Sequence, residues 1–250
     1  MTVATALING GGKMILPIKT KRVVFFFCTM MLLGIMPGFA EDFKYDGSNV
    51  HLLITEISES TLRLTLTSAE PGDTLTALNK SLVLSSSEWP RPEFQEQSAE
   101  APLSLTFTSM NVLVTPFPLT VTITDKNQKT MQNLIFQPES GDIRFIMGTQ
   151  PLLGLGGGGL DYDRRGVCES MDKGHRSGEY QIHGSRVPVP LLIGTEGWAL
   201  FFHRPYNGAF DLRGPEVLYI PPRSNDEINE KPQPLDLFII QAESPKQIPA

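Results

Sequence analysis

The sequence is poor in cysteine. It contains two, and because Cys28 lies in an apolar N-terminal run, Cys168 stands alone in the rest of the chain. One cysteine cannot form an internal disulfide, and no set of Cys and His residues has the spacing of a zinc site. The fold must therefore be held by a hydrophobic core, and the about 210 residues after position 40 are enough to build one. Neither a metal nor a cofactor is predicted.

Positive charge is also scarce beyond the first 40 residues. The N-terminal segment holds Lys13, Lys19, Lys21 and Arg22 and no acidic residue. Without it, 17 basic residues face 27 acidic ones, which gives a net charge of −10. The remaining Lys and Arg residues are scattered, so the chain has no basic surface for a nucleic acid. Nucleic-acid binding is therefore excluded as a predicted function.

The N-terminal cations precede an uncharged run, VVFFFCTMMLLGIM, that ends at Pro37 and Gly38. Gly38-Phe39-Ala40 then has the small-x-small pattern of a signal-peptidase site. The rival interpretation is an uncleaved membrane anchor, but the run is short for a full span and is broken by Pro-Gly. We predict cleavage after Ala40, a secreted or periplasmic location, and no stable membrane insertion after cleavage.

The predicted organisation is therefore a signal peptide over residues 1–40 and one domain over residues 41–250. The first 13 residues look like an overlong start, and Met14 is as plausible an initiator as Met1. No internal repeat or linker divides the remaining chain.

After residue 40 no stretch sustains the apolar spacing of an amphipathic helix over three turns. Thr61–Thr67 instead alternates Leu62, Leu64 and Leu66 with polar residues, which is typical of a half-buried strand. Further predicted strands are Leu103–Ser109, Leu119–Asp125, Asn133–Gln137, Ile143–Gly148, Val189–Gly194, Trp198–His203, Val217–Pro221 and Leu235–Ile240. Short connections and frequent prolines favour an all-β fold, an antiparallel β-sandwich or barrel.

The run GLGGGGLDYDRRG, from Gly154 to Gly166, formally matches the G-x-G-x-x-G fingerprint of dinucleotide-binding loops. Such a loop needs a helix after it, because the helix N-terminus binds the pyrophosphate. No apolar helical face follows, and no Gly-Lys-Ser/Thr completes a Walker A loop. The glycines are better explained by a backbone turn with positive φ at the edge of a sandwich.

A longer stretch carries a family resemblance. PLLGLGGGGLDYDRRG and then VPVPLLIGTEGW, from Val187 to Trp198, resemble the N-terminal domain of glycoside hydrolase family 31, the α-glucosidase and α-xylosidase family. Phe210-Asp211-Leu212 and Leu235-Asp236-Leu237-Phe238 continue the match, which covers about Gly47 to Ser244. The resemblance implies a galactose mutarotase-like β-sandwich.

The sequence departs from the family at two points. The family usually has an acidic residue directly after Gly-Leu-Gly, where this chain has Gly157. The family's catalytic (β/α)8 barrel should also begin after Leu235–Gln247. Such a barrel needs roughly 250 residues, whereas this sequence stops at Ala250. Both catalytic carboxylates of the family lie on that barrel, so the resemblance carries over no catalytic residue. The implied function is an ancillary domain that packs on a barrel, supplied in cis or by a split gene, and that is inactive alone.

The resemblance also implies a carbohydrate contact. In family members one loop of the sandwich reaches the rim of the sugar pocket, and the matching loop here is Val167–Arg186. Its candidate ligands for an α-linked oligosaccharide are Asp172, His175, Arg176 and Gln181, since charged and amide groups form strong hydrogen bonds with sugar hydroxyls. The alternative is a solvated, glycine-rich loop.

The remaining motif residues have structural interpretations. Asp163, Arg164 and Arg165 are expected to form an ion-pair network that fixes the turn, and Asp211 to be a turn or domain-contact residue. Trp198 is expected in the core rather than on the surface as a sugar platform. The structural motif comprises Gly154, Gly156, Asp163, Arg164, Arg165, Gly166, Gly197, Trp198 and Asp211.

Two other functions remain open. One is a stand-alone carbohydrate-binding module. The other is a mutarotase-like aldose epimerase, in which His175, His183 and Glu179 would supply an acid and a base. These three residues crowd one glycine-rich loop instead of facing a cleft from separate strands, which disfavours the epimerase.

Overall fold

The computed structural model describes residues 40–69, 88–157, 161–171, 187–203, 208–214, 216–220, 235–242 and 244–248. Residues 1–39 of the predicted signal peptide lie outside this part of the chain. The described residues form strands and a single short 3₁₀ helix, Pro245–Gln247, with no α-helix among them. The prediction of an all-β fold is confirmed.

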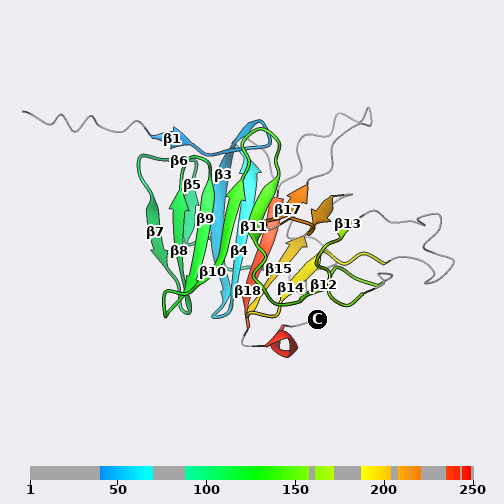
Figure 1. The fold of residues 1–250 in the computed structure, drawn as a ribbon. Helices are drawn as coiled ribbons and strands as arrows, with labels where there is room; N and C mark the ends of the chain where they lie inside the picture. The colour runs from blue at the N-terminus through cyan, green and yellow to red at the C-terminus, as the bar shows by residue number, and fades with distance from the viewer. Residues whose placement is uncertain are drawn as a thin grey trace, which may run out of the picture. The chain divides into compact units, whose positions relative to one another are not determined.

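The strands form two eight-stranded antiparallel sheets (Figure 1). The first, which we call the β4 sheet, contains in spatial order β12 (Leu152–Gly154), β14 (Leu191–Gly194), β15 (Trp198–His203), β18 (Leu235–Gln241), β4 (Thr61–Ser68), β3 (Ser48–Ser58) and β2 (Lys44–Tyr45), with β5 (Phe94–Glu96) also paired to β3. β18, the last of the described strands along the sequence, thus lies between β15 and β4.

The second sheet is called the β10 sheet. It contains in spatial order β13 (Cys168–Ser170), β16 (Ala209–Asp211), β17 (Glu216–Ile220), β11 (Ile143–Ile146), β10 (Thr130–Phe136), β9 (Thr120–Asp125), β8 (Met110–Thr115) and β7 (Leu103–Thr106). A separate two-stranded ribbon pairs β1 (Glu41–Asp42) with β6 (Ser98–Ala99). Each predicted strand overlaps one of these strands, whereas no strand was predicted at β1, β2, β3, β5, β6, β8, β12, β13 or β16.

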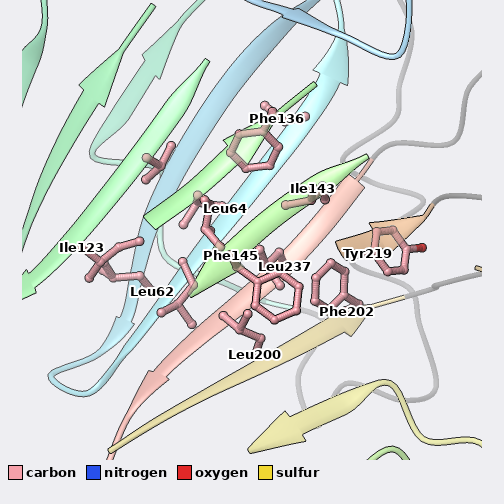
Figure 2. Close-up of a cluster of buried hydrophobic side chains, with 14 of the residues drawn as sticks. Leu62, Leu64, Ile123, Phe136, Ile143, Phe145, Leu200, Phe202, Tyr219 and Leu237 are labelled. Atoms are coloured by element: carbon pink, nitrogen blue, oxygen red, sulfur yellow. The ribbon is translucent and has the colours of Figure 1, made fainter. Parts of the chain in front are cut away.

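One hydrophobic core joins the inner faces of the two sheets. Phe145 of the β10 sheet contacts Trp198 and Phe202 of the β4 sheet, with ring centroids 6.5 and 6.4 Å apart. Tyr219 stacks on Phe202 at 4.4 Å. Figure 2 shows the side chains that line this interface: Leu62, Leu64, Leu200, Phe202 and Leu237 from the β4 sheet and Ile123, Phe136, Ile143, Phe145 and Tyr219 from the β10 sheet. Packing across two sheets defines a β-sandwich.

β4 differs from its prediction as a half-buried strand. Leu62, Leu64 and Leu66 face the core as expected, but Arg63, Thr65 and Thr67 on the other face are buried too. Aromatic rings pack against Arg63 on this outer face: its guanidinium lies 5.5 Å from the centroid of the Trp89 ring and 5.4 Å from that of Phe238, which belongs to the adjacent strand β18. The polar half of the alternating pattern is therefore interior as well.

Two further features of the described residues concern membrane-spanning helices and metal-binding clusters. Within the described residues, no helix is long and apolar enough to span a membrane. In the same part of the chain, no group of three or more His, Cys, Asp or Glu side chains is arranged to hold a metal ion.

Candidate functional site

The glycine run begins where the edge strand β12 leaves the β4 sheet. Gly154, Leu155 and Gly156 all have positive φ, at 98°, 59° and 85°. A Cβ on Gly154 would lie 2.1 Å from the carbonyl oxygen of Leu191, and one on Gly156 would lie 2.0 Å from that of Val187. Both positions therefore require glycine for conformation and for space. The prediction of a positive-φ turn at a sandwich edge is confirmed.

No helix follows this turn within the described residues. After it, the chain passes through Asp161–Gly166 and enters β13, which pairs with β16. The aligned N–H groups that bind a pyrophosphate at a helix N-terminus are absent from these residues.

Arg164 holds the turn from the inside. Its side chain is nearly buried, and it donates hydrogen bonds from Nε to the Gly154 carbonyl at 3.0 Å and from Nη2 to the Gly156 carbonyl at 2.8 Å. Its Nη1 lies 3.6 Å from Glu169 Oε1 on β13. A planar guanidinium holds its donors on separate nitrogens in a fixed fork and so binds two carbonyls of one turn in a defined geometry, whereas a lysine has a single nitrogen on a flexible stem.

Asp163 and Arg165 attach the same segment to β12 and to the residues before it. Asp163 Oδ1 accepts hydrogen bonds from the backbone N–H groups of Leu152, at 2.9 Å, and of Arg165, at 3.1 Å. Arg165 donates from Nε to the Gln150 carbonyl at 2.7 Å and from Nη2 to the same oxygen.

The expected ion-pair network among Asp163, Arg164 and Arg165 is therefore wrong in its chemistry. The three side chains fix the turn, but they bind mainly backbone groups, and the ion pair of Arg164 is with Glu169. The reason is local: a left-handed turn at a sheet edge leaves carbonyl and N–H groups without ladder partners, and these groups need hydrogen bonds. Charged side chains satisfy them.

Other motif residues occupy turns or the core. Gly166 has a φ of 80° and donates from its N–H to the Leu212 carbonyl. Gly197, with a φ of 109°, lies in the turn between β14 and β15. Trp198 is 3% exposed and packs on Gly194, where a Cβ would lie 2.1 Å from the indole. The interpretation of Trp198 as a core residue is confirmed.

Asp211 ends β16 and forms a local ion pair. Its carboxylate accepts hydrogen bonds from Arg213 Nε at 2.8 Å and Nη2 at 2.6 Å. The Arg213 hydrogen bonds hold the pKa of Asp211 below its ordinary value. Arg213 also donates from its backbone N–H to Asp211 Oδ1, which makes Asp211 a turn residue.

The predicted sugar-binding residues Asp172, His175, Arg176 and Gln181 lie outside the described residues. The same holds for the histidines and Glu179 of the epimerase hypothesis. These assignments stay predictions. The structure describes the turn from which their loop departs, up to Met171.

A buried charged cluster that the sequence patterns did not reveal lies on the outer face of the β4 sheet. It joins Arg63 of β4, Asp236 of β18 and His203 of β15. Arg63 donates to Asp236 from Nε and Nη2, both at 2.8 Å, and Thr65 donates to Asp236 Oδ1 at 3.0 Å. His203 Nδ1 lies 2.7 Å from Asp236 Oδ2. Asp236 is fully buried.

The cluster has defined electrostatics. Burial by itself would raise the pKa of Asp236, but the hydrogen bonds from His203 and Arg63 outweigh it and lower that pKa. An ionised carboxylate only accepts hydrogen bonds, so Nδ1 of His203 must carry a proton. Nε2 of His203 is buried, and within the described residues it has no hydrogen-bond partner. The one sequence signal for this cluster was a charge, Asp236, within the apolar run LDLFII.

Comparisons with known proteins show which solved structures share this fold. No protein-family model matches the chain, and no curated protein matches it in sequence. Among solved structures, a family 31 (GH31) dextranase of Flavobacterium johnsoniae complexed with isomaltotriose matches 78% of this chain and 24% of its own, at 15% identity and a TM-score of 0.58.

Two further structures agree. The cycloalternan-forming enzyme of Listeria monocytogenes, in complex with a pentasaccharide substrate, matches 81% of this chain and 21% of its own, at 11% identity and a TM-score of 0.54. A xylosidase of Aspergillus niger matches 82% and 30%, at 13% identity and a TM-score of 0.52. The chain thus spans between a fifth and a third of the length of these enzymes. As its motifs predict, the chain has the fold of a partial domain of glycoside hydrolase family 31 enzymes.

Proposed function

We propose that this chain is the ancillary N-terminal domain of a secreted family 31 α-glycosidase, of the α-glucosidase or α-xylosidase type. It packs on a catalytic (β/α)8 barrel and contributes its Val167–Arg186 loop to carbohydrate binding. The observation that carries the proposal is the partial match: most of this chain aligns with less than a third of each matched enzyme. Family motifs at the glycine turn support it, because their side chains fix the start of that loop.

The proposal leaves the chain without hydrolytic activity of its own. A retaining glycosidase needs two carboxylates about 5 Å apart across the scissile bond. The family resemblance places both on the barrel, so the barrel must come from the same gene or from a neighbouring one.

The DNA that follows the codon for Ala250 tests the first part of the proposal. An open reading frame for a (β/α)8 barrel is expected there, in frame or separated by a short interruption. Unrelated sequence in that place would contradict the proposal. The barrel, produced with and without this chain, should then hydrolyse a p-nitrophenyl α-glycoside only when the chain is present and the two co-purify.

The loop contribution needs a separate measurement. In the assembled enzyme, Asp172→Ala and Arg176→Ala are expected to raise KM for an α-linked oligosaccharide, with a smaller effect on kcat. Phe117→Ala is a suitable control, because Phe117 lies in the β8–β9 turn and is exposed. An unchanged KM in both loop variants would argue that the loop is only solvated.

A further inference from the structure

Tyr162 is the most exposed of the large apolar or aromatic side chains that the structure describes. It is 93% exposed, although it lies within the segment that the glycine turn and its arginines fix in place. Directly after it, Asp163 accepts a hydrogen bond from the Leu152 N–H, and Arg164 donates its own N–H to the Leu152 carbonyl. The backbone that carries the Tyr162 ring is therefore attached to β12 at the next two residues.

An exposed aromatic ring on an anchored backbone is suited to binding. Tyrosine offers a large contact area and has few rotatable bonds, so little conformational entropy is lost when a ligand covers it. Anchoring lowers that cost again, since the backbone is ordered before the ligand arrives.

Asp161, on the other side of Tyr162, adds a polar group. Its side chain is exposed, and in the described part of the chain its carboxylate has no hydrogen-bond partner, whereas the carboxylate of Asp163 is occupied by two backbone N–H groups. The segment therefore carries an exposed aromatic ring and, on the preceding residue, an exposed carboxylate that can accept hydrogen bonds.

The ligand that suits this pair is a neutral ring with both apolar and hydroxyl surfaces. One face of a pyranose carries C–H groups, which pack on the electron-rich face of an aromatic ring, and its vicinal hydroxyls can donate to one carboxylate. A phosphorylated or carboxylated ligand would be repelled by Asp161 and by the acidic balance of the chain after residue 40. A neutral oligosaccharide fits these chemical constraints.

We propose that Tyr162 and Asp161 form a carbohydrate subsite, with Tyr162 as a stacking platform and Asp161 as acceptor for sugar hydroxyls. This inference rests on the proposed carbohydrate-related function. It adds a site outside the Val167–Arg186 loop, on residues whose placement the structure describes.

Two exposed valines, Val187 and Val189, lie on the other side of the glycine turn, where Gly157 forms a β-bridge with Val187.

Isothermal titration of the full chain with isomaltotriose, and separately with maltotriose, tests the subsite. Tyr162→Ala should weaken binding at least about tenfold, which corresponds to roughly 1.4 kcal/mol. Tyr162→Trp should retain binding because it keeps a ring, and Asp161→Asn should weaken it by a smaller factor. Phe117→Ala, which removes an exposed ring in the β8–β9 turn, should bind as the wild type does.

Three outcomes would contradict the proposed subsite. Equal affinity of wild type and Tyr162→Ala, or no binding by the wild type at millimolar sugar, would overturn the subsite. Loss of co-purification with the barrel in Tyr162→Ala, with sugar affinity unchanged, would also overturn it and assign Tyr162 to a protein contact. None of these results touches the DNA downstream of Ala250, so the proposed function and the subsite can fail independently.

Discussion

Replacing Asp236 by Asn is expected to be the most damaging isosteric change at the outer face of the β4 sheet. The fully buried carboxylate accepts two hydrogen bonds from Arg63 at 2.8 Å, one from Thr65 at 3.0 Å and one from His203 at 2.7 Å. An amide keeps the shape but presents N–H groups to donors on one side, and it removes the negative charge opposite the buried guanidinium.

The magnitude follows from this burial. Removing one partner from a buried ion pair costs about 3–5 kcal/mol, because the other charge stays in a poorly solvated site. In a protein of this size 1 kcal/mol corresponds to about 2–4 °C, so Tm should fall by roughly 6–20 °C. Differential scanning calorimetry of the full chain measures the change.

Asp211→Asn is the matched control. It removes a carboxylate from an equally short pair with Arg213, but that arginine is 63% exposed. Water screens such a pair, so little change in Tm is expected. If Asp236→Asn at pH 7 unfolds within about 1 kcal/mol of the wild type, a range typical of exposed ion pairs, the assignment of a stabilising buried cluster is wrong.

The pH dependence gives a second readout. Because the pKa of Asp236 is lowered in the fold, its ionised form stabilises the protein above the unfolded-state pKa of about 3.9. That contribution is lost as the pH falls from this value through the folded-state pKa. The difference between wild type and Asp236→Asn should therefore be full at pH 7 and shrink below about pH 4.

Three further predictions concern turns. Gly156→Ala should lower Tm by several degrees because its Cβ would meet the Val187 carbonyl, whereas Gly157→Ala, with open space at that position, should change Tm little; equal effects would contradict the turn geometry. Arg164→Lys should destabilise the fold by about 1–3 kcal/mol in urea unfolding, since the single nitrogen of a lysine does not reproduce the two separate guanidinium nitrogens that bind the turn carbonyls. Asp46 has a pKa raised by burial and by Asp142, so its ionisation destabilises the fold as the pH rises above about 4, and Asp46→Asn should raise Tm at pH 7 but not at pH 3.

Local patterns predicted the strands because side chains alternate between two faces of a sheet. Leu62, Leu64 and Leu66 lie in the core as their spacing indicates. The order of strands could not be predicted in the same way. Pairing of β18 with β4 depends on contacts between residues 173 positions apart, such as Arg63 and Asp236, which no local pattern encodes.

The backbone of the candidate site could be predicted from the sequence, but the partners of its charged side chains could not. Gly154 and Gly156 were predicted to turn with positive φ, because glycine is the residue that tolerates such a backbone. The partners of Arg164 were not predicted, since an arginine can bind carboxylates or carbonyls and only the folded turn decides which are near. His203 was missed for a similar reason: its carboxylate partner is on another strand.

The position of β18 has a consequence for biosynthesis. The ribosome makes Leu235–Gln241 last among the strands described, yet this strand joins β15 to β4 in the centre of its sheet (Figure 1). Until it emerges, the hairpin of β3 and β4 and the hairpin of β14 and β15 each carry an unpaired inner edge, which can pair with other chains. A nascent chain stalled before residue 235 is therefore expected to need a chaperone, and the sheet can close only once Leu235–Gln241 has left the ribosome.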